Sequence, residues 1–162
     1  MDGIDFGILT ELQNNARLSN KELAAKVKLA PSSCLERTRR LQQSGVLRGF
    51  HADVDPAALG VGLQAMIHVR LARHSRGHVE DLQDHLRQVP EVIGFYHLTG
   101  EFDFLVHVAV RDADHLRNLA LDAFTTREEI AQIQTSLIYS KMRKSIWPRF
   151  HPAANGDLEG NP

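Results

Sequence analysis

The fold is decided by the stretch Leu18–Leu41, which reads LSNKELAAKVKLAPSSCLERTRRL. Ser19 followed by Glu22 has the spacing of a capping box, which predicts the start of a short helix. A second helix is predicted over Pro31–Gln43, because proline suits the first helical position, where its missing amide has no partner to lose. Two helices separated by a tight turn are typical of a helix-turn-helix.

The residues on either side complete this unit. Apolar residues recur at helical spacing over Ile4–Leu12, which predicts a helix before the quoted stretch. Gly45 suits the left-handed residue that ends the last helix. Residues 46–54 alternate loosely and predict a strand, which Asp55 and Pro56 end. Three helices followed by a strand indicate a helix-turn-helix unit of the winged-helix type.

The pattern of apolar residues changes after Gly62. From there on, segments with the alternation of a strand and segments with helical spacing follow one another along the chain. The expected elements are a strand over 64–71, a helix over 79–89, strands over 92–98 and 102–110, a helix opened by Asp112 or Asp114, and a strand over 130–139. The order β-α-β-β-α-β is that of a ferredoxin-like fold. Both helices then cover one face of an antiparallel sheet, and the other face is free to pack against a second copy of the chain.

The predicted fold class is therefore α+β, with two domains. Residues 1–50 are expected to form the helix-turn-helix domain and 51–62 a linking strand and turn. Residues 63–147 are expected to form the ferredoxin-like domain, and 148–162 a disordered tail, since residues 151–162 have one large apolar residue, Leu158.

Composition excludes several classes of protein. The 162 residues are 43% hydrophobic and 24% charged, as in ordinary globular proteins. A single cysteine, Cys34, excludes an intramolecular disulfide and a cysteine-rich zinc site. No apolar run approaches the roughly 18 residues of a membrane span. The first residues lack the basic start of a signal peptide, so a cytoplasmic protein is expected.

Charge is distributed unevenly along the chain, although the formal net charge is only -1. Residues 1–50 carry eight basic and five acidic side chains, and the remaining residues carry eleven basic and fifteen acidic ones. A basic N-terminal part joined to an acidic C-terminal part suggests a nucleic-acid-binding module with a partner domain.

Taken together, these segments resemble the Lrp/AsnC (feast/famine) family of transcriptional regulators. Leu18–Leu41 resembles the family's helix-turn-helix, and Gly45–Phe50 resembles the strand after it. Residues 99–103, TGEFD, resemble the G-x-x-D turn of the family's effector-binding domain. The resemblance covers residues 2–147, and the string CLER at 34–37 is similar to the branch that contains the leucine-responsive regulatory protein. Ala30 departs from the serine usual there, so Ser32 or Ser33 is an alternative helix cap.

The resemblance implies what such a protein binds. A family member is expected to bind double-stranded DNA in a sequence-specific manner, with no cofactor and no membrane association. A small effector, an amino acid, is expected to modulate DNA binding or assembly. Homodimers are expected to associate further into tetramers or octamers, with the amino acid bound between dimers.

The candidate DNA contacts are residues of the helix predicted over Pro31–Gln43: Ser32, Ser33, Arg37, Arg39 and Arg40. A helical wheel puts Arg37 and Arg40 with Glu36 on the outer side, opposite an apolar side to which Leu35 belongs, and puts Arg39 nearer the edge. Arginine pairs with guanine or clamps phosphate. The two serines, at the helix start, would donate to phosphate or only cap the helix. Glu36 would orient Arg40, cap the helix or accept from cytosine, and a merely solvated basic face remains the alternative.

The candidate effector contacts lie around the turn: Leu98, Gly100, Asp103 and Ser136. Glycine permits close backbone approach or a positive φ angle. Asp103 would accept an amino acid's ammonium group or hold the loop through backbone amides. Leu98 and Ser136 become neighbours if the last strand ends near this turn. A purely structural turn is the alternative.

Neither catalysis nor metal binding is predicted. The sequence contains no G-x-S-x-G, no phosphate loop and no H-E-x-x-H. Its nine histidines are expected at the surface or in interfaces, because no Cys/His cluster accompanies them, and Cys34 falls on the buried side of its helix, where it acts as a small apolar residue. The competing hypotheses are an oligomeric scaffold that binds no DNA and a small enzyme on the ferredoxin-like fold.

Overall fold

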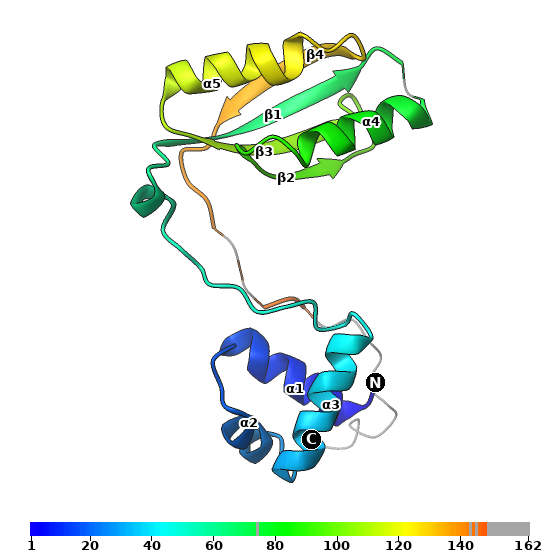
Figure 1. The fold of residues 1–162 in the computed structure, drawn as a ribbon, viewed down its shortest axis with the longest axis vertical. Helices are drawn as coiled ribbons and strands as arrows, with labels where there is room; N and C mark the ends of the chain where they lie inside the picture. Colours follow the sequence, from blue (N-terminus) through cyan, green and yellow to red (C-terminus); the bar gives the residue numbers. More distant parts are fainter. Residues whose placement is uncertain (74, 143, 145, 149–162) are drawn as a thin grey trace, which may run out of the picture. The chain divides into compact units, whose positions relative to one another are not determined.

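The chain divides into two units in a computed structural model that describes residues 1–73, 75–142, 144 and 146–148 (Figure 1). The N-terminal unit comprises Met1–Ala52 together with the described residues from Met142 onward, and the C-terminal unit comprises Asp53–Lys141. The predicted disordered tail, 148–162, lies outside the described residues apart from Pro148. Each unit has its own hydrophobic core.

Three helices form the N-terminal unit: α1 (Gly3–Asn14), α2 (Asn20–Lys26) and α3 (Pro31–Gln43). All three predicted helices are confirmed. Their apolar stripes meet in one core, whose buried members are Ile8, Leu12, Leu23, Ala24, Cys34 and Leu41. The burial of Cys34 raises the pKa of its thiol, which keeps it protonated and unreactive, as expected of an apolar residue.

The helix ends explain why the two helices after residue 18 start where they do. The predicted capping box is present, because the Glu22 amide donates to Ser19 Oγ and the Ser19 amide donates to Glu22 Oε2, at 3.3 and 2.8 Å. Helix α3 begins at Pro31 with Ala30 as its N-cap and has no side-chain cap. The alternative caps one turn later, Ser32 and Ser33, are therefore wrong.

The start of α3 has a different polar contact. The Asn20 side-chain amide donates to the Pro31 carbonyl at 2.8 Å and joins the first turns of α2 and α3. At the other end, Gly45 has φ +72°, which confirms it as the left-handed residue after the helix.

The strand predicted over residues 46–54 is wrong, because these residues belong to no strand in the structure. An isolated extended segment gains no ladder hydrogen bonds, and none of the described strands pairs with this one. Its large apolar side chains stay partly in solvent, since Val46, Phe50 and Val54 are 44%, 45% and 50% exposed.

The C-terminal unit is a four-stranded antiparallel sheet of order β2-β3-β1-β4. The strands are β1 (Leu63–Leu71), β2 (Val92–His97), β3 (Phe104–Val110) and β4 (Ile130–Leu137). The helices are α4 (Arg76–Leu86) and α5 (Ala113–Ala120), which runs into a π-helical turn, Leu121–Thr125, and a short 3-10 helix, Pro56–Leu59, precedes the sheet. This order confirms the ferredoxin-like arrangement.

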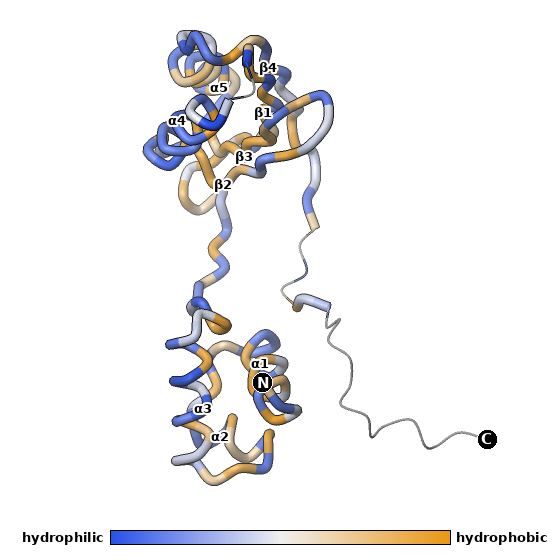
Figure 2. The backbone as a smooth tube through the Cα atoms, turned by 90° about the vertical axis from the view of Figure 1, so that its right-hand side faces the viewer, coloured by the Kyte–Doolittle hydropathy of each residue, from blue (hydrophilic) through white to orange (hydrophobic). Residues whose placement is uncertain are grey.

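The sheet has one covered face and one open face. Helices α4 and α5 lie on the same side of the strands (Figure 2). Alternate residues of β1, namely Ala65, Ile67, Val69 and Leu71, are buried beneath them, as predicted. Met66 and His68 point to the open face. No helix in the described part of the chain is long and apolar enough to cross a membrane.

Candidate nucleic-acid interface and effector turn

Helix α3 presents a broad exposed face. Its buried residues, Cys34 and Leu41, define the inner side, and at about 100° per residue the opposite direction falls between Ser32 and Gln43. Arg39 lies next to this centre and is exposed, so its predicted place at the helix edge is wrong. Leu35 is 38% exposed, which corrects its predicted place on the buried side.

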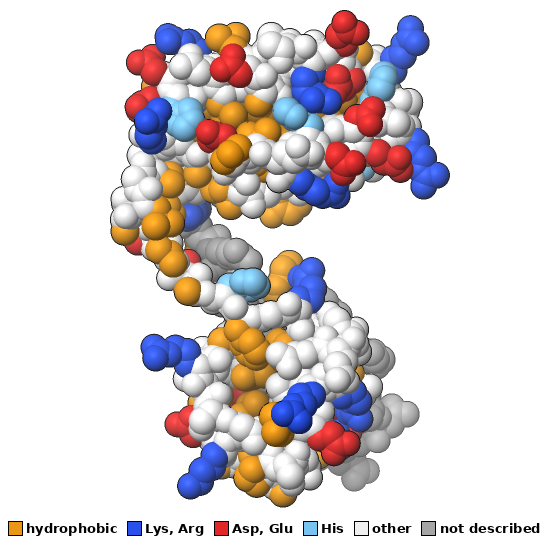
Figure 3. All heavy atoms as spheres, in the orientation of Figure 1, with side chains coloured by type: hydrophobic (Ala, Val, Ile, Leu, Met, Phe, Trp, Pro, Cys, Tyr) orange, Lys and Arg blue, Asp and Glu red, His pale blue; other side chains and the backbone are white. Residues whose placement is uncertain are grey.

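The five predicted DNA contacts share one region of α3. A surface hollow is lined by Ser32, Ser33, Leu35, Glu36, Arg37, Arg39, Arg40 and Gln43. Lys and Arg side chains stand out over the surface of the N-terminal unit (Figure 3). The arginines of α3 differ in their partners, however.

Arg37 is held by two carboxylates of the first helix. Its Nη1 donates to Asp2 Oδ2 at 2.7 Å and to Asp5 Oδ1 at 2.9 Å. The Arg37 side chain is 26% exposed. These carboxylates raise the pKa of Arg37, so its charge is fixed and already compensated within the protein. The wheel placed this residue on the outer side, whereas the structure turns it toward α1.

Arg40 shares one of these carboxylates. Its Nη2 lies 3.1 Å from both Asp5 oxygens, although its side chain is 62% exposed. The predicted pairing with Glu36 is not formed, since the ion pairs of the described residues join Arg40 to Asp5 instead. Arg39 makes no ion pair or side-chain hydrogen bond among the described residues, so its guanidinium is available to another molecule.

Asp5 is the one buried charged residue that the structure describes, with 1% of its surface exposed. Besides the two arginines, it accepts from the Asp2 amide at 3.1 Å, and its own amide donates to Asp2 Oδ1 at 2.9 Å. Burial alone would raise the pKa of Asp5, yet the Asp2 amide and Arg37 lower it on balance. The carboxylate is therefore charged and fully hydrogen-bonded.

Sequence reasoning missed Asp2 and Asp5, although a signal was present. The two acids are three residues apart, and Arg37 and Arg40 are also three residues apart. Matching spacings place each pair on one helix face. The second residue of the pair also completes a capping box at the start of α1, which was not recognised.

The turn over residues 98–103, where effector contacts are predicted, is pinned to the end of β1. The Leu71 amide donates to Asp103 Oδ2 at 2.7 Å, and the Asp103 amide donates to the Val69 carbonyl at 2.9 Å. The Leu98 amide donates to the Asp103 carbonyl at 2.8 Å, which closes the loop. Gly100, at its tip, has φ +126°, a conformation that suits glycine. Of the two roles predicted for Asp103, holding the loop through a backbone amide is present.

Ser136 does not join the other three effector candidates within one chain. It pairs with Met66 in the middle of β1, whereas the turn lies beyond Val69 and Leu71. Strand β4 runs away from the turn, because its first residue, Ile130, is the one opposite Leu71. At about 3.3 Å per residue, five residues of β1 separate Ser136 from the turn by roughly 16 Å. The predicted proximity of Leu98 and Ser136 is therefore wrong.

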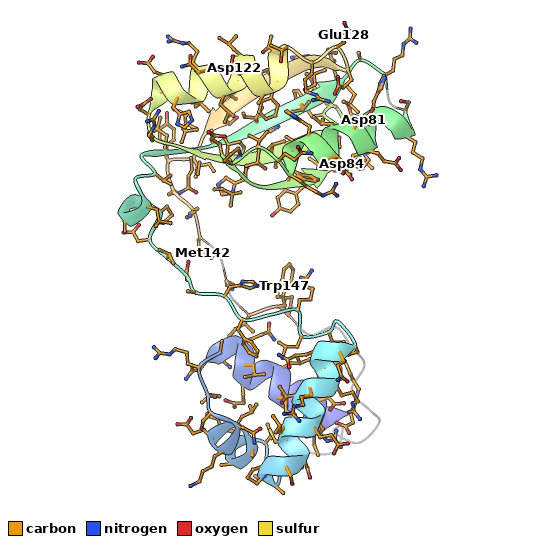
Figure 4. All side chains as sticks on the ribbon, in the orientation of Figure 1. Asp81, Asp84, Asp122, Glu128, Met142 and Trp147 are labelled. Carbon is orange, nitrogen blue, oxygen red and sulfur yellow. The ribbon has the colours of Figure 1, made fainter. Side chains whose placement is uncertain are left out.

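A separate polar hollow lies between α4 and the turn before β4. Asp81 and Asp84 project from α4, and Glu128 stands at that turn (Figure 4). Arg127, also in the lining, pairs with Glu129, and His85 Nε2 lies 2.9 Å from the Ala123 carbonyl. Among the described residues no three potential ligands are grouped so that they could hold a metal ion.

Two family models match the two parts of the chain. Residues 1–48 match a winged helix-turn-helix DNA-binding model, and residues 64–148 match the Lrp/AsnC ligand binding domain. The HTH-type transcriptional regulator AldR of Mycolicibacterium smegmatis is 46% identical over 143 residues, which are 88% of this chain and 84% of the relative. The leucine-responsive regulatory protein of Escherichia coli is 30% identical over 90% of this chain and 88% of its own length.

Solved structures agree with these matches. A transcriptional regulator from Neisseria meningitidis, in complex with L-Met, is similar with a TM-score of 0.81 and 34% identity, covering 88% of this chain and 92% of that one. AsnC of Escherichia coli has a TM-score of 0.78 and 28% identity, covering 88% and 96%.

Proposed function

Because the chain belongs to the Lrp/AsnC family of DNA-binding transcriptional regulators, we propose a division of its task between the two parts. Residues 1–50 bind double-stranded DNA, 51–62 link the parts, and 63–147 bind an effector and assemble the protein. The chain acts by binding rather than by catalysis, and it acts in the cytoplasm, where it meets genomic DNA. The observation that carries the DNA assignment is the exposed basic face of α3 in a three-helix unit.

The DNA contacts divide by their partners. Arg39 is exposed near the centre of the outer face and contacts base edges in the major groove, where arginine pairs with guanine. Ser32 and Ser33, exposed in the first turn of α3, donate to a phosphate at the positive end of the helix. Arg40, exposed but bound to Asp5, reaches a phosphate from the rim, and Arg37 supports the helix from its inner edge.

The effector is an amino acid, as in the related complex with L-Met. Leu98 and Gly100 lie at the pinned turn, and Asp103 offers a carboxylate there. Ser136 joins these residues only if a second copy of the chain supplies it, because it lies far from the turn in its own chain. The amino acid therefore binds between copies, which makes effector binding depend on assembly.

Assembly begins at the open face of the sheet. A dimer joined there has two-fold symmetry and presents two α3 helices to a pseudo-palindromic site. Dimers associate further to tetramers or octamers, and an amino acid that binds one assembly better than another shifts the equilibrium. A coupling of about 1 to 3 kcal/mol changes DNA affinity by a few-fold to about a hundredfold.

The experiment that tests this function is capture of sheared genomic DNA on the purified protein at about 0.15 M salt, which suppresses non-specific phosphate binding. A parallel capture contains a mixture of amino acids. Enrichment of a few pseudo-palindromic fragments establishes the regulator, and a change in the recovered set establishes the effector response. No enrichment in either capture would favour an oligomeric scaffold that binds no DNA.

A further inference from the structure

We propose that Asp5 is a positioning residue for DNA recognition, which fixes the rotation of α3 by holding Arg37 and Arg40 against α1 and so leaves Arg39 to contact DNA. This inference rests on the proposed DNA-binding function and deepens it. It gives the three arginines of α3 different tasks: Arg37 acts within the protein, Arg40 is held by Asp5 at the rim, and Arg39 is left to contact DNA bases.

The geometry of the contact carries the argument. Two arginines, one turn apart on α3, converge on a single carboxylate whose side chain is 2% exposed. Asp5 Oδ1 accepts from Arg37 at 2.9 Å and from Arg40 at 3.1 Å. The carboxylate itself is fixed, because Asp2 and Asp5 exchange capping-box hydrogen bonds at the first turn of α1. Two anchor points along α3 oppose rotation of the helix about its own axis.

Rotation of α3 matters for one kind of DNA contact more than for another. Base-edge hydrogen bonds depend on where a side chain enters the groove, whereas attraction to phosphate is tolerant of position. Arg39, Ser32 and Gln43 are turned outward only while the opposite edge of α3 faces α1. Loss of the anchor is therefore expected to lower the preference for the cognate sequence while sparing non-specific affinity.

The three arginines also differ in whether their positive charge is already compensated by carboxylates within the protein. Arg37 is already neutralised by Asp2 and Asp5, so it releases no counterion when DNA binds. Arg39 has no such partner among the described residues and adds fully to the salt dependence. Arg37, a basic residue of α3, therefore contributes to DNA binding without touching DNA.

The first test compares Asp5→Asn with Glu11→Gln in the full chain. Both changes remove one negative charge from α1, but Glu11 pairs with Lys26 of α2 and not with α3. The readout is the ratio of affinities for a duplex recovered by genomic capture and for a shuffled duplex of equal length. We expect Asp5→Asn to lower this ratio by about tenfold or more, the scale of one lost base contact, and Glu11→Gln to leave it within about twofold.

The second test does not depend on the folding of Asp5→Asn. Arg37→Met and Arg39→Met remove equal charge from neighbouring positions of α3, and the slope of log affinity against log salt concentration is measured for each. An uncompensated guanidinium at a base edge still neutralises nearby phosphate charge and releases a counterion. We therefore expect Arg39→Met to reduce the slope by about 0.9 and Arg37→Met to leave the slope unchanged.

The outcomes separate the inference from the function beneath it. A wild-type protein that shows no preference for any captured duplex overturns the DNA-binding function itself. A wild-type protein with a clear preference that Asp5→Asn retains in full overturns only the positioning role. A slope that falls equally for Arg37→Met and Arg39→Met places Arg37 on a phosphate and overturns the separation of the arginines.

Discussion

Lys28 occupies a backbone position that favours glycine. It follows the C-cap of α2 with φ +56°, and the Leu29 amide donates to the Ala24 carbonyl at 2.9 Å, while the Lys28 amide donates to Ala25 at 3.3 Å. This pair of bonds is the Schellman motif, which closes α2 and starts the turn into α3. A left-handed conformation costs a residue with a Cβ atom roughly 1 to 2 kcal/mol.

We expect Lys28→Gly to stabilise the N-terminal unit by about 0.5 to 1 kcal/mol, because the relieved strain exceeds the added freedom of glycine in the unfolded chain. Urea unfolding followed by circular dichroism measures the change. Ala25→Gly is the matched control, since Ala25 is exposed within α2 and glycine there costs about 1 kcal/mol. Equal destabilisation by both substitutions would contradict the assignment of strain to Lys28.

Gly100 is a second residue whose backbone conformation favours glycine. Its φ is +126°, and a Cβ atom there would meet nothing within 4 Å, so any penalty for alanine is conformational rather than steric. We expect Gly100→Ala to cost about 1 to 3 kcal/mol in the C-terminal unit and to weaken the response to amino acids. Gly94→Ala serves as the control, because it also meets nothing within 4 Å and its φ is not positive. Thermal unfolding that falls equally for both variants would show that the turn tolerates a side chain.

At the scale of elements, the contact between α1 and α3 depends on ionised carboxylates. The Asp5 amide and the Arg37 side chain lower the pKa of Asp2, and the Asp2 amide and Arg37 lower that of Asp5 against the effect of burial. A folded-state pKa below the unfolded value means that protons bind the unfolded chain more tightly. The contact therefore contributes its full stability above pH 4 or so, and the contribution is lost as the pH falls below that value.

We expect the difference in unfolding free energy between the wild-type protein and Asp5→Asn to be constant from pH 7 to 5 and to shrink toward pH 3. Denaturant titrations of the N-terminal transition at each pH measure this difference. Glu11→Gln, which removes the half-buried partner of exposed Lys26, provides the comparison for an ion pair near the surface, which contributes little at any pH. A difference that grows toward pH 3 would mean that Asp5 is protonated in the folded protein.

Local patterns predicted the elements well where the chain itself supplies the partner. The helices of the N-terminal unit follow from apolar spacing and caps, and the alternation of β1 predicted its buried residues Ala65 to Leu71. The strand over 46–54 failed because a strand needs a neighbour, which a local pattern does not reveal.

The site was harder to predict than the fold for the same reason. The wheel drawn for α3 alone put Arg37 on the outer side and Arg39 nearer the edge, whereas the structure shows the reverse, because the carboxylates that hold Arg37 lie more than thirty residues away. Ser136 was grouped with Leu98 on an assumed strand end, whereas the register of β1 and β4 separates the two residues. Residue types indicated which side chains could bind DNA or an effector. Contacts between distant parts of the chain determined which of these side chains share a site.

At the scale of the whole molecule, the open face of the sheet is the surface through which we expect copies of the chain to assemble. Leu105 of β3 stands at its centre, opposite His68 of β1 and Tyr96 of β2. Met66, one pair farther along, adds a second large apolar side chain. An antiparallel sheet with helices on one side only leaves the other side, where Leu105 and Met66 stand among His68 and His107, open to pack against a copy of itself.

We therefore expect Leu105→Asp to convert the assembly to monomers that remain folded, because a new carboxylate is tolerated in water but costs several kcal/mol when buried unpaired in an interface. Sedimentation velocity measures the mass of the particle. Leu121→Asp is the control, since Leu121 is 50% exposed beyond α5, on the helical side of the sheet. Monomers should also bind a pseudo-palindromic duplex far more weakly than the wild type, because two linked α3 helices bind with a gain that single ones lack. A Leu105→Asp variant that sediments like the wild type would move the interface off the sheet, and the two-fold presentation of α3 would then need another contact to produce it.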